Sequence, residues 1–178
     1  MTKAGSPWSM KVAIDEITET GAHFNLSADE RIRAELTEIA GLRALPQLEA
    51  SFEVNRHGRD GLRVVGEVSA TIRQTCVVTL EAMVNELRES VDLLFVPPTA
   101  GSIAEQSDVT MRVDKREPPD TLSDGAVDLG AVATEFLLLG IDPYPRKPGA
   151  TFEVASAGDP ESHPFAALLA LKMGKGGN

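Results

Sequence analysis

Two neighbouring stretches of this chain alternate apolar and polar residues, and they constrain the fold more than any other feature. Apolar residues occupy every second position from Leu48 to Val54 and most such positions from Leu62 to Ile72. Successive side chains of a β-strand point to opposite faces, so each stretch predicts a strand with one buried and one solvated face. The turn-forming pair Asp60-Gly61 ends the polar connection between them. The pattern predicts an antiparallel hairpin, in which Gly66 indicates a bulge or a tight bend.

Two further strands are predicted on either side of this hairpin. Alternation from Met10 to Asp15 indicates a first strand. A third amphipathic stretch, from Glu86 to Phe95, predicts another strand, which Pro97-Pro98 ends.

A helix is predicted between the first strand and the hairpin. Ser27 is placed to cap its first turn, Glu30 to complete a capping box, and Gly41 to end it. Apolar residues recur between them at helical spacing, at Ile32, Leu36 and Ile39.

The C-terminal third predicts helices separated by prolines. Asp128 is expected to cap an apolar helix that begins at Leu129, and prolines at positions 143, 145 and 148 prevent its continuation. A last short helix is predicted over residues 164–172, with Pro164 at the first position that favours proline.

Together these elements predict an α+β fold, with an antiparallel, strongly curved β-sheet packed against two or three α-helices. Residues 1–178 are expected to form a single domain. Residues from about 100 to 125 are polar and rich in turn formers, which predicts a mobile insertion. Alternation over 109–113 leaves a short edge strand open as an alternative, and the tail from about 173 is expected to be frayed.

Charge and composition narrow the possible partners. The net charge of −10 excludes a general electrostatic grip on nucleic acid, so DNA is not an expected partner, whereas basic ribosomal proteins would be attracted. An aromatic content of 4% also argues against a base-stacking platform. No apolar run reaches the roughly 20 residues that cross a bilayer, and one cysteine excludes an internal disulfide. These features predict a cytoplasmic protein with no membrane partner.

The sequence offers no recognisable reaction, and we expect no catalytic residue, no metal site and no cofactor. Phosphate-binding glycine loops and the nucleophile-elbow serine motif are absent from the sequence. The three histidines, at 23, 57 and 163, lie too far apart for a short-spacing metal motif. Cys76 is either a nucleophile or a small buried hydrophobe. The second interpretation is favoured, because nothing nearby in the sequence indicates a lowered thiol pKa.

One group of cations is suggestive of RNA contact. Arg56, Arg59, Arg63 and Arg73 cluster on the predicted hairpin and its loop, in an otherwise acidic chain. Arg63 and Arg73 share strand parity, so both are expected on the solvated face. The alternative is a solvated hairpin whose charges prevent aggregation of the sheet, and we favour it over RNA contact.

The order of several short motifs resembles a known family. Gln74-Thr-Cys76-Val-Val-Thr79-Leu-Glu81 precedes Val127-Asp128-Leu129, then a Pro-rich segment over 142–148, then His163-Pro-Phe165. This order is similar to that of the YceD-like, or large ribosomal RNA subunit accumulation, proteins over residues 10–172. The residues that match the family motif are expected to be structural: Cys76, Thr79, Leu80, Glu81, Asp128, Leu129, Pro164 and Phe165.

The resemblance departs from the family pattern at its cysteines. Thr79 stands where the family motif Cys-x-x-Cys-Leu-Glu has its second cysteine, and the Pro-rich segment lacks the further pair that some relatives carry. A structural zinc site needs four protein ligands, so this chain is not expected to hold the zinc that such pairs would suggest.

The resemblance implies a bacterial, non-enzymatic accessory factor for 23S ribosomal RNA accumulation, processing or stability. Such a factor would act by binding a ribosomal protein or ribosomal RNA, and the acidic charge favours the protein. The alternative is a small-molecule-binding or enzymatic domain with a pocket inside the curved sheet.

Overall fold

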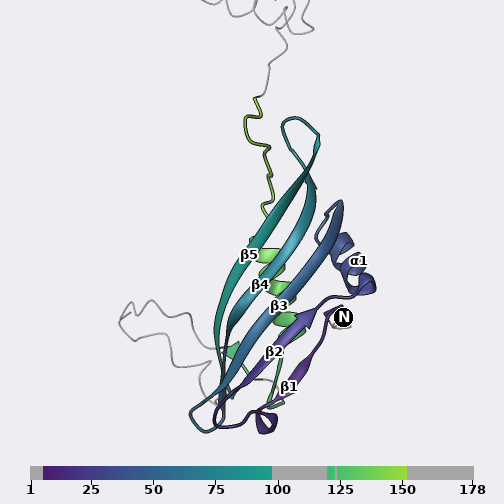
Figure 1. Cartoon of the computed structure of the whole chain (residues 1–178). Coiled ribbons are helices and arrows are strands. Elements are labelled where there is room, and N and C mark those ends of the chain that lie inside the picture. Colours follow the sequence, from purple (N-terminus) through teal and green to yellow (C-terminus); the bar gives the residue numbers. More distant parts are fainter. Residues whose placement is uncertain (1–5, 98–119, 123, 152–178) are drawn as a thin grey trace, which may run out of the picture.

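The computed structural model describes residues 6–97, 120–122 and 124–151, which form an α+β fold (Figure 1). The main sheet has five strands in the order β2-β3-β4-β5-β6. Their bounds are Ala22–Ser27, Ala44–His57, Gly61–Thr75, Ala82–Val96 and Asp120–Thr121. All pairings are antiparallel except that of β6, which runs parallel to the last two residues of β5. The predicted hairpin is confirmed as β3–β4, and β5 begins four residues before the predicted strand.

The polar and apolar faces of the hairpin lie as the alternation predicts. Inward residues of β4 such as Val64 and Val68 are fully buried, whereas Arg63 and Arg73 are exposed on the outer face. That face is open to solvent among the described residues. The prediction of an amphipathic sheet with one solvated face is therefore confirmed.

The N-terminal strand is shorter than predicted and belongs to a second sheet. β1 (Lys11–Ala13) pairs antiparallel with β7 (Ala126–Asp128), and the 3-10 turn η1 (Ile14–Glu16) follows it. Alternation over the six residues from Met10 to Asp15 fits a strand, but η1 turns the chain after the first four of them.

The prediction for the start of the first helix was wrong. Ser27 is the last residue of β2, a strand that the sequence prediction missed, and α1 runs over Glu30–Ile39. Asp29 is the N-cap, and its carboxylate accepts a hydrogen bond from the Ile32 amide at 2.8 Å. Pairing with β3 keeps Ser27 extended, which leaves the capping position to Asp29.

The buried face of α1 is narrower than predicted. Leu36 is fully buried, whereas Ile39 in the last turn is 59% exposed. Gly41 has φ +63°, a left-handed conformation that suits glycine just after a helix, as predicted.

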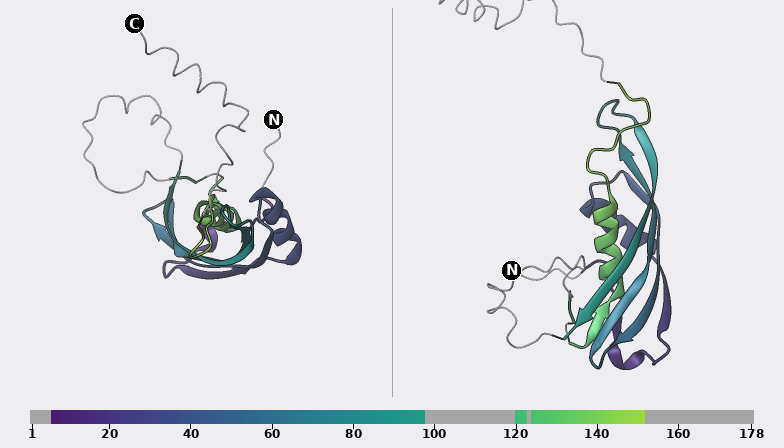
Figure 2. Two further views of the ribbon diagram at one scale, coloured as in Figure 1. Left: turned by 90° about the horizontal axis from the view of Figure 1, so that it is seen from above. Right: turned by 90° about the vertical axis from the view of Figure 1, so that its left-hand side faces the viewer.

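The second helix, α2 (Leu129–Gly140), confirms its predicted cap, because the Asp128 carboxylate accepts from the Ala131 amide at 3.1 Å. Figure 2 shows α2 lying along the inner face of the sheet. Leu129, Val132 and Leu137 of α2 join the inward residues of β3, β4 and β5 in one buried cluster. This cluster lies on the inner side of the sheet, where a small-molecule-binding or enzymatic domain was expected to have its pocket.

The expectation of a strongly curved sheet was wrong. The sheet is neither strongly curled nor closed, and over the described ranges its order β2-β3-β4-β5-β6 leaves two free edges. Strong curvature needs bulges or glycine kinks along the strands. The register of β3 with β4 shifts only at the start of β3, between Ala44 and Gln47, and pairing is continuous from Gln47 to His57 and from Leu62 to Thr75 with β5. Gly66 pairs regularly, and instead of a bulge it makes room for a neighbour: a Cβ there would lie 2.7 Å from Cδ1 of Phe52.

Two α-helices are present in the described ranges. The helix expected over 164–172, the edge strand expected over 109–113 and most of the expected mobile insertion lie outside them. At the end of that insertion, Asp120 and Thr121 form β6, and Leu122 is buried.

Candidate interaction site at the tip of the β4–β5 hairpin

The connection between β4 and β5 is a tight loop at one end of the molecule. The Cys76 amide donates to the Glu81 carbonyl at 2.9 Å, and the Leu80 amide donates to the Cys76 carbonyl at 3.0 Å. Leu80 has φ +59°, the left-handed region that is sparsely populated by residues with a side chain. Its side chain is nevertheless 74% exposed. The loop therefore holds a strained leucine in solvent, an arrangement that burial does not explain.

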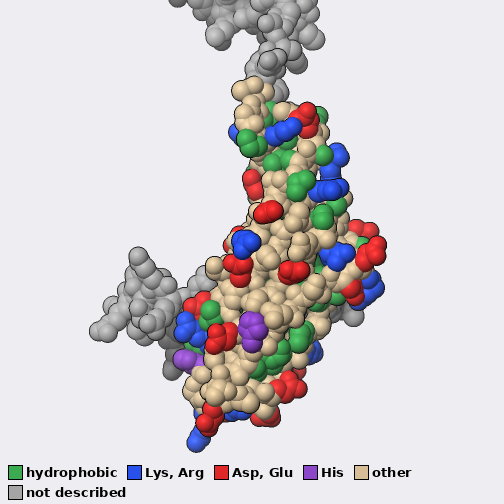
Figure 3. Space-filling view, viewed as in Figure 1, with side chains coloured by type: hydrophobic (Ala, Val, Ile, Leu, Met, Phe, Trp, Pro, Cys, Tyr) green, Lys and Arg blue, Asp and Glu red, His purple; other side chains and the backbone are tan. Residues whose placement is uncertain are grey.

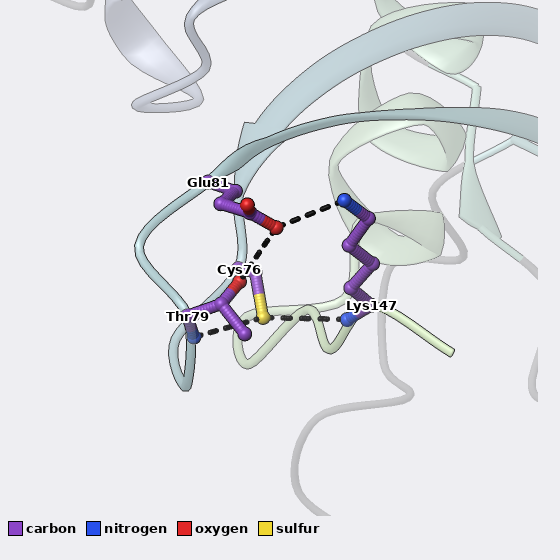
Figure 4. A network of polar contacts seen from close by, with 4 residues as sticks. All are labelled: Cys76, Thr79, Glu81 and Lys147. Carbon is purple, nitrogen blue, oxygen red and sulfur yellow. Dashed lines mark hydrogen bonds and ion pairs between the residues drawn. The ribbon is translucent and has the colours of Figure 1, made fainter. Parts of the chain in front are cut away.

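Cys76 organises this loop from beneath (Figure 4). Its side chain is fully buried, and its Sγ accepts hydrogen bonds from the backbone amides of Thr79 at 3.4 Å and Lys147 at 3.3 Å. The Thr79 side chain and these amides lower the pKa of the Cys76 thiol to about 6, against the effect of burial. Burial of Cys76 was predicted correctly, but the neighbouring sequence did not indicate the lowered pKa of its thiol.

An ion pair closes the same network at the surface. Lys147 Nζ lies 2.9 Å from Glu81 Oε2, and the Thr79 hydroxyl donates to the same carboxylate at 3.4 Å. The hydrogen bond and charge of Lys147 lower the pKa of Glu81, and Glu81 raises that of Lys147. The Val77 amide also donates to the Pro145 carbonyl at 2.9 Å. The Pro-rich segment is thus fastened to the hairpin loop.

The outside of this end combines cations with exposed apolar groups. We define the tip patch as three arginines, Arg43, Arg73 and Arg146, and three exposed apolar or aromatic residues, Val77, Leu80 and Tyr144. Figure 3 shows Lys and Arg side chains over this end, lying among hydrophobic and acidic ones. The acidic residues nearest in sequence to the loop and Tyr144 are Glu81 and Asp142. Glu81 forms an ion pair with Lys147, and the Asp142 carboxylate accepts a hydrogen bond from the Tyr144 amide at 2.8 Å.

The predicted arginine cluster is divided between the two ends of the sheet. Arg56 is structural, because its guanidinium donates to the carbonyls of Ile17 at 2.7 Å and Ile14 at 3.1 Å. Arg59 is exposed in the β3–β4 turn. Arg73 lies ten residues along β4 from Arg63, or about 33 Å at the usual rise per residue.

Arg63 is held on the outer face by a bidentate pair. Its Nε and Nη2 lie 2.9 and 2.8 Å from the two oxygens of Asp92. These hydrogen bonds raise the pKa of Arg63 and lower that of Asp92. Of the four predicted RNA contacts, only Arg73 lies at the tip.

Two of the other residues of the family motif, Asp128 and Leu129, lie in the described part of the chain and make contacts within the fold. Leu129 is fully buried. Asp128 accepts from the Ser9 hydroxyl at 2.6 Å and from the Met10 amide at 2.8 Å, besides capping α2. Burial opposes its ionisation, but these hydrogen bonds lower the pKa of Asp128 overall. Pro164 and Phe165 lie outside the described residues.

A groove runs from the tip along the edge of β5. Its volume is about 530 Å³, and its lining includes Val84, Asn85, Glu86 and Arg146. Asn85 donates to Gln74 at 2.9 Å, and Gln74 donates to the Asp142 carbonyl at 2.9 Å, which ties the groove floor to the segment after α2. Among the described residues, β6 covers β5 only at its last two positions, so most of this edge has no neighbouring strand.

Within residues 6–97, 120–122 and 124–151, no group of three or more His, Cys, Asp or Glu side chains is arranged to hold a metal ion. His23 and His57 are exposed, and His163 lies outside these ranges. No helix in the described part of the chain is long and apolar enough to cross a membrane.

The fold and the tip define an α+β protein with a solvated sheet face and an exposed, charged hairpin end. A sequence profile of the family described as large ribosomal RNA subunit accumulation protein YceD matches residues 64–172. The chain therefore belongs to the YceD family. No curated protein sequence matches the chain, and no solved structure does.

Proposed function

We propose that this protein is a non-enzymatic accessory factor for the accumulation of 23S ribosomal RNA, and that it acts by binding a component of the assembling large subunit. The family match over residues 64–172 carries this proposal, because the family is described by large ribosomal RNA subunit accumulation. The matched span contains β5, α2 and every residue of the tip patch except Arg43.

The geometry favours binding over catalysis. The loop between β4 and β5 and the Pro-rich segment are fixed to each other by hydrogen bonds through Cys76, Val77 and Lys147. Such a network presents Leu80 and Tyr144 to solvent on a preorganised backbone, which lowers the entropic cost of binding a partner.

The overall charge bears on which component is bound. With a net charge of −10, most of the surface attracts a basic ribosomal protein and repels RNA. The outer sheet face carries exposed carboxylates at Glu49, Glu53 and Glu86 that suit such a protein. The tip patch is an exception, because its three arginines make it locally positive on a protein of negative net charge.

The test is a deletion strain in which both mature ribosomal RNAs are measured over several growth conditions. We expect the ratio of large-subunit to small-subunit RNA to fall on deletion and to recover when the full-length gene is restored. An unchanged ratio under every condition would remove the proposal.

A further inference from the structure

We infer that the tip patch binds a single-stranded segment of RNA, with its arginines on phosphates and Tyr144 against a base. This inference rests on the proposed function and names the partner for one surface of the protein. It is carried by the distribution of unpaired positive charge, by the exposure of Tyr144 and by the rigidity of the backbone that presents it.

Of the six arginines elsewhere in the described chain, three form ion pairs, Arg33 and Arg56 donate to backbone carbonyls, and Arg59 is exposed without an ion pair. Arg31, Arg63 and Arg88 each form an ion pair with a neighbouring carboxylate. In the described ranges, Arg73 and Arg146 have no ion-pair partner. Arg43 donates only to a neutral group, the Thr75 hydroxyl at 2.6 Å. Guanidinium groups without a neighbouring carboxylate can bind phosphates even in an acidic chain. Such binding releases the counterions that were condensed on the nucleic acid.

Tyr144 supplies the second element of the site. It is the only tyrosine of the chain and its side chain is 71% exposed. Hydrogen bonds on both sides fix its backbone: its own amide donates to Asp142, and the next residue, Pro145, accepts from Val77. An exposed ring on a fixed backbone offers a stacking surface for an unpaired base, which a duplex does not expose.

An acidic protein segment is the rival occupant, since carboxylates also pair with arginine. RNA is favoured because an exposed ring beside unpaired arginines can stack on a base whose phosphates the arginines bind, and because the family is described by ribosomal RNA. The rival makes a distinct prediction in the experiment that follows.

The test measures binding of the full chain to labelled RNA by fluorescence anisotropy over a series of salt concentrations. One probe is an oligouridylate of about 16 nucleotides, and the other is a duplex RNA of equal length. Three variants are compared with the unchanged protein: R73Q/R146Q, Y144A and the charge-matched control R59Q/R63Q at the opposite end of the sheet. All five substituted residues are exposed, and circular dichroism checks that each variant is folded.

We expect the single strand to bind more tightly than the duplex. R73Q/R146Q should weaken binding at low salt about tenfold and reduce the salt slope by about 1.4, because each lost phosphate contact removes about 0.7. Y144A should weaken binding about fivefold or more and leave the slope unchanged. R59Q/R63Q should stay within about twofold of the unchanged protein.

Equal weakening by R59Q/R63Q, an unchanged slope in R73Q/R146Q, or preference for the duplex would overturn the inference. So would the absence of RNA binding together with capture of a ribosomal protein by the unchanged tip. The deletion strain distinguishes failure of RNA binding by the tip patch from failure of the proposed function. If the RNA ratio falls on deletion and R73Q/R146Q restores it fully, the function stands and the tip assignment fails.

Discussion

At Cys76, a single sulfur atom joins segments that are 71 residues apart in the chain. The folded state favours the Cys76 thiolate, because the N–H groups that donate to its Sγ stabilise a negatively charged sulfur more than a neutral thiol. The folded pKa of about 6 lies below that of an ordinary thiol, about 8.5. The resulting stabilisation is fully present above the unfolded pKa and is lost as the pH falls through about 6.

Cys76→Ser is therefore expected to lower the free energy of unfolding, and to lower it more at about pH 9 than at about pH 5. Urea denaturation at both pH values measures the difference. Ser69→Ala on the solvated face of β4 serves as the control, whose effect should not change with pH. A loss of stability that is the same at both pH values would contradict the assigned thiol pKa.

The same sulfur bears on metal binding. Cys76 is the only cysteine of the chain, and two backbone amides already donate to its Sγ. We expect the purified protein to contain no stoichiometric zinc and to keep its denaturation midpoint in the presence of a chelator. One tightly bound zinc ion per chain by metal analysis would show this to be wrong.

Among the elements, β3 and β4 depend on one close contact across the inner face. Phe52 is fully buried and its ring lies over Gly66 on the paired strand. Gly66→Ala should lower the free energy of unfolding by about 1–3 kcal/mol, because the added methyl group would clash with both the Ser51 carbonyl and the Phe52 ring. Chemical denaturation measures the loss.

The matched control for Gly66→Ala is Thr71→Ala, which removes atoms from the solvated side of the same strand. It should change stability by no more than about 0.5 kcal/mol. Equal stability of Gly66→Ala and the unchanged protein would mean that the ring moves freely.

How far these elements could be predicted depended on how local their signals are. Alternation found β3 and β4, and the side chain of Asp128 indicated its helix, because each signal lies within a few residues. β2 was missed and Asp29 was passed over, because pairing with β3 decides which residues before α1 stay extended. The site was indicated only in part. Cys76, Thr79, Leu80, Glu81 and Arg73 were singled out from the sequence, but the contact of Cys76 with Lys147 leaves no trace in residues next to either.

At the scale of the whole molecule, one buried cluster unites α2 with the inner face of the sheet and with Trp8 near the N-terminus. The chain should therefore unfold in a single transition. Leu137→Ala is expected to cost about 2–5 kcal/mol, because it leaves a cavity at a fully buried position.

Two probes test this cooperativity. Far-ultraviolet circular dichroism reports on the strands, and fluorescence reports on Trp8, the only tryptophan. Both midpoints should shift together in Leu137→Ala. Leu139→Ala, at a largely exposed position of α2, should change the free energy of unfolding by no more than about 0.5 kcal/mol by either probe. Separate midpoints would divide the cluster into independent units.

The bonds from Ser9 and Met10 to Asp128 also set an order of events during translation. Ser9 and Asp128 are separated by 119 residues, so at about 5–20 residues per second roughly 6–24 s pass before the second follows the first. The strands β2 to β5 can pair as they emerge, but their apolar side has no cover until α2 is made. Ribosome-bound nascent chains that end before residue 140 lack a complete α2 and should be cut readily by protease, whereas the released full-length chain should resist. During those seconds the apolar face of the sheet is accessible to chaperones that bind nascent chains at the ribosomal exit tunnel.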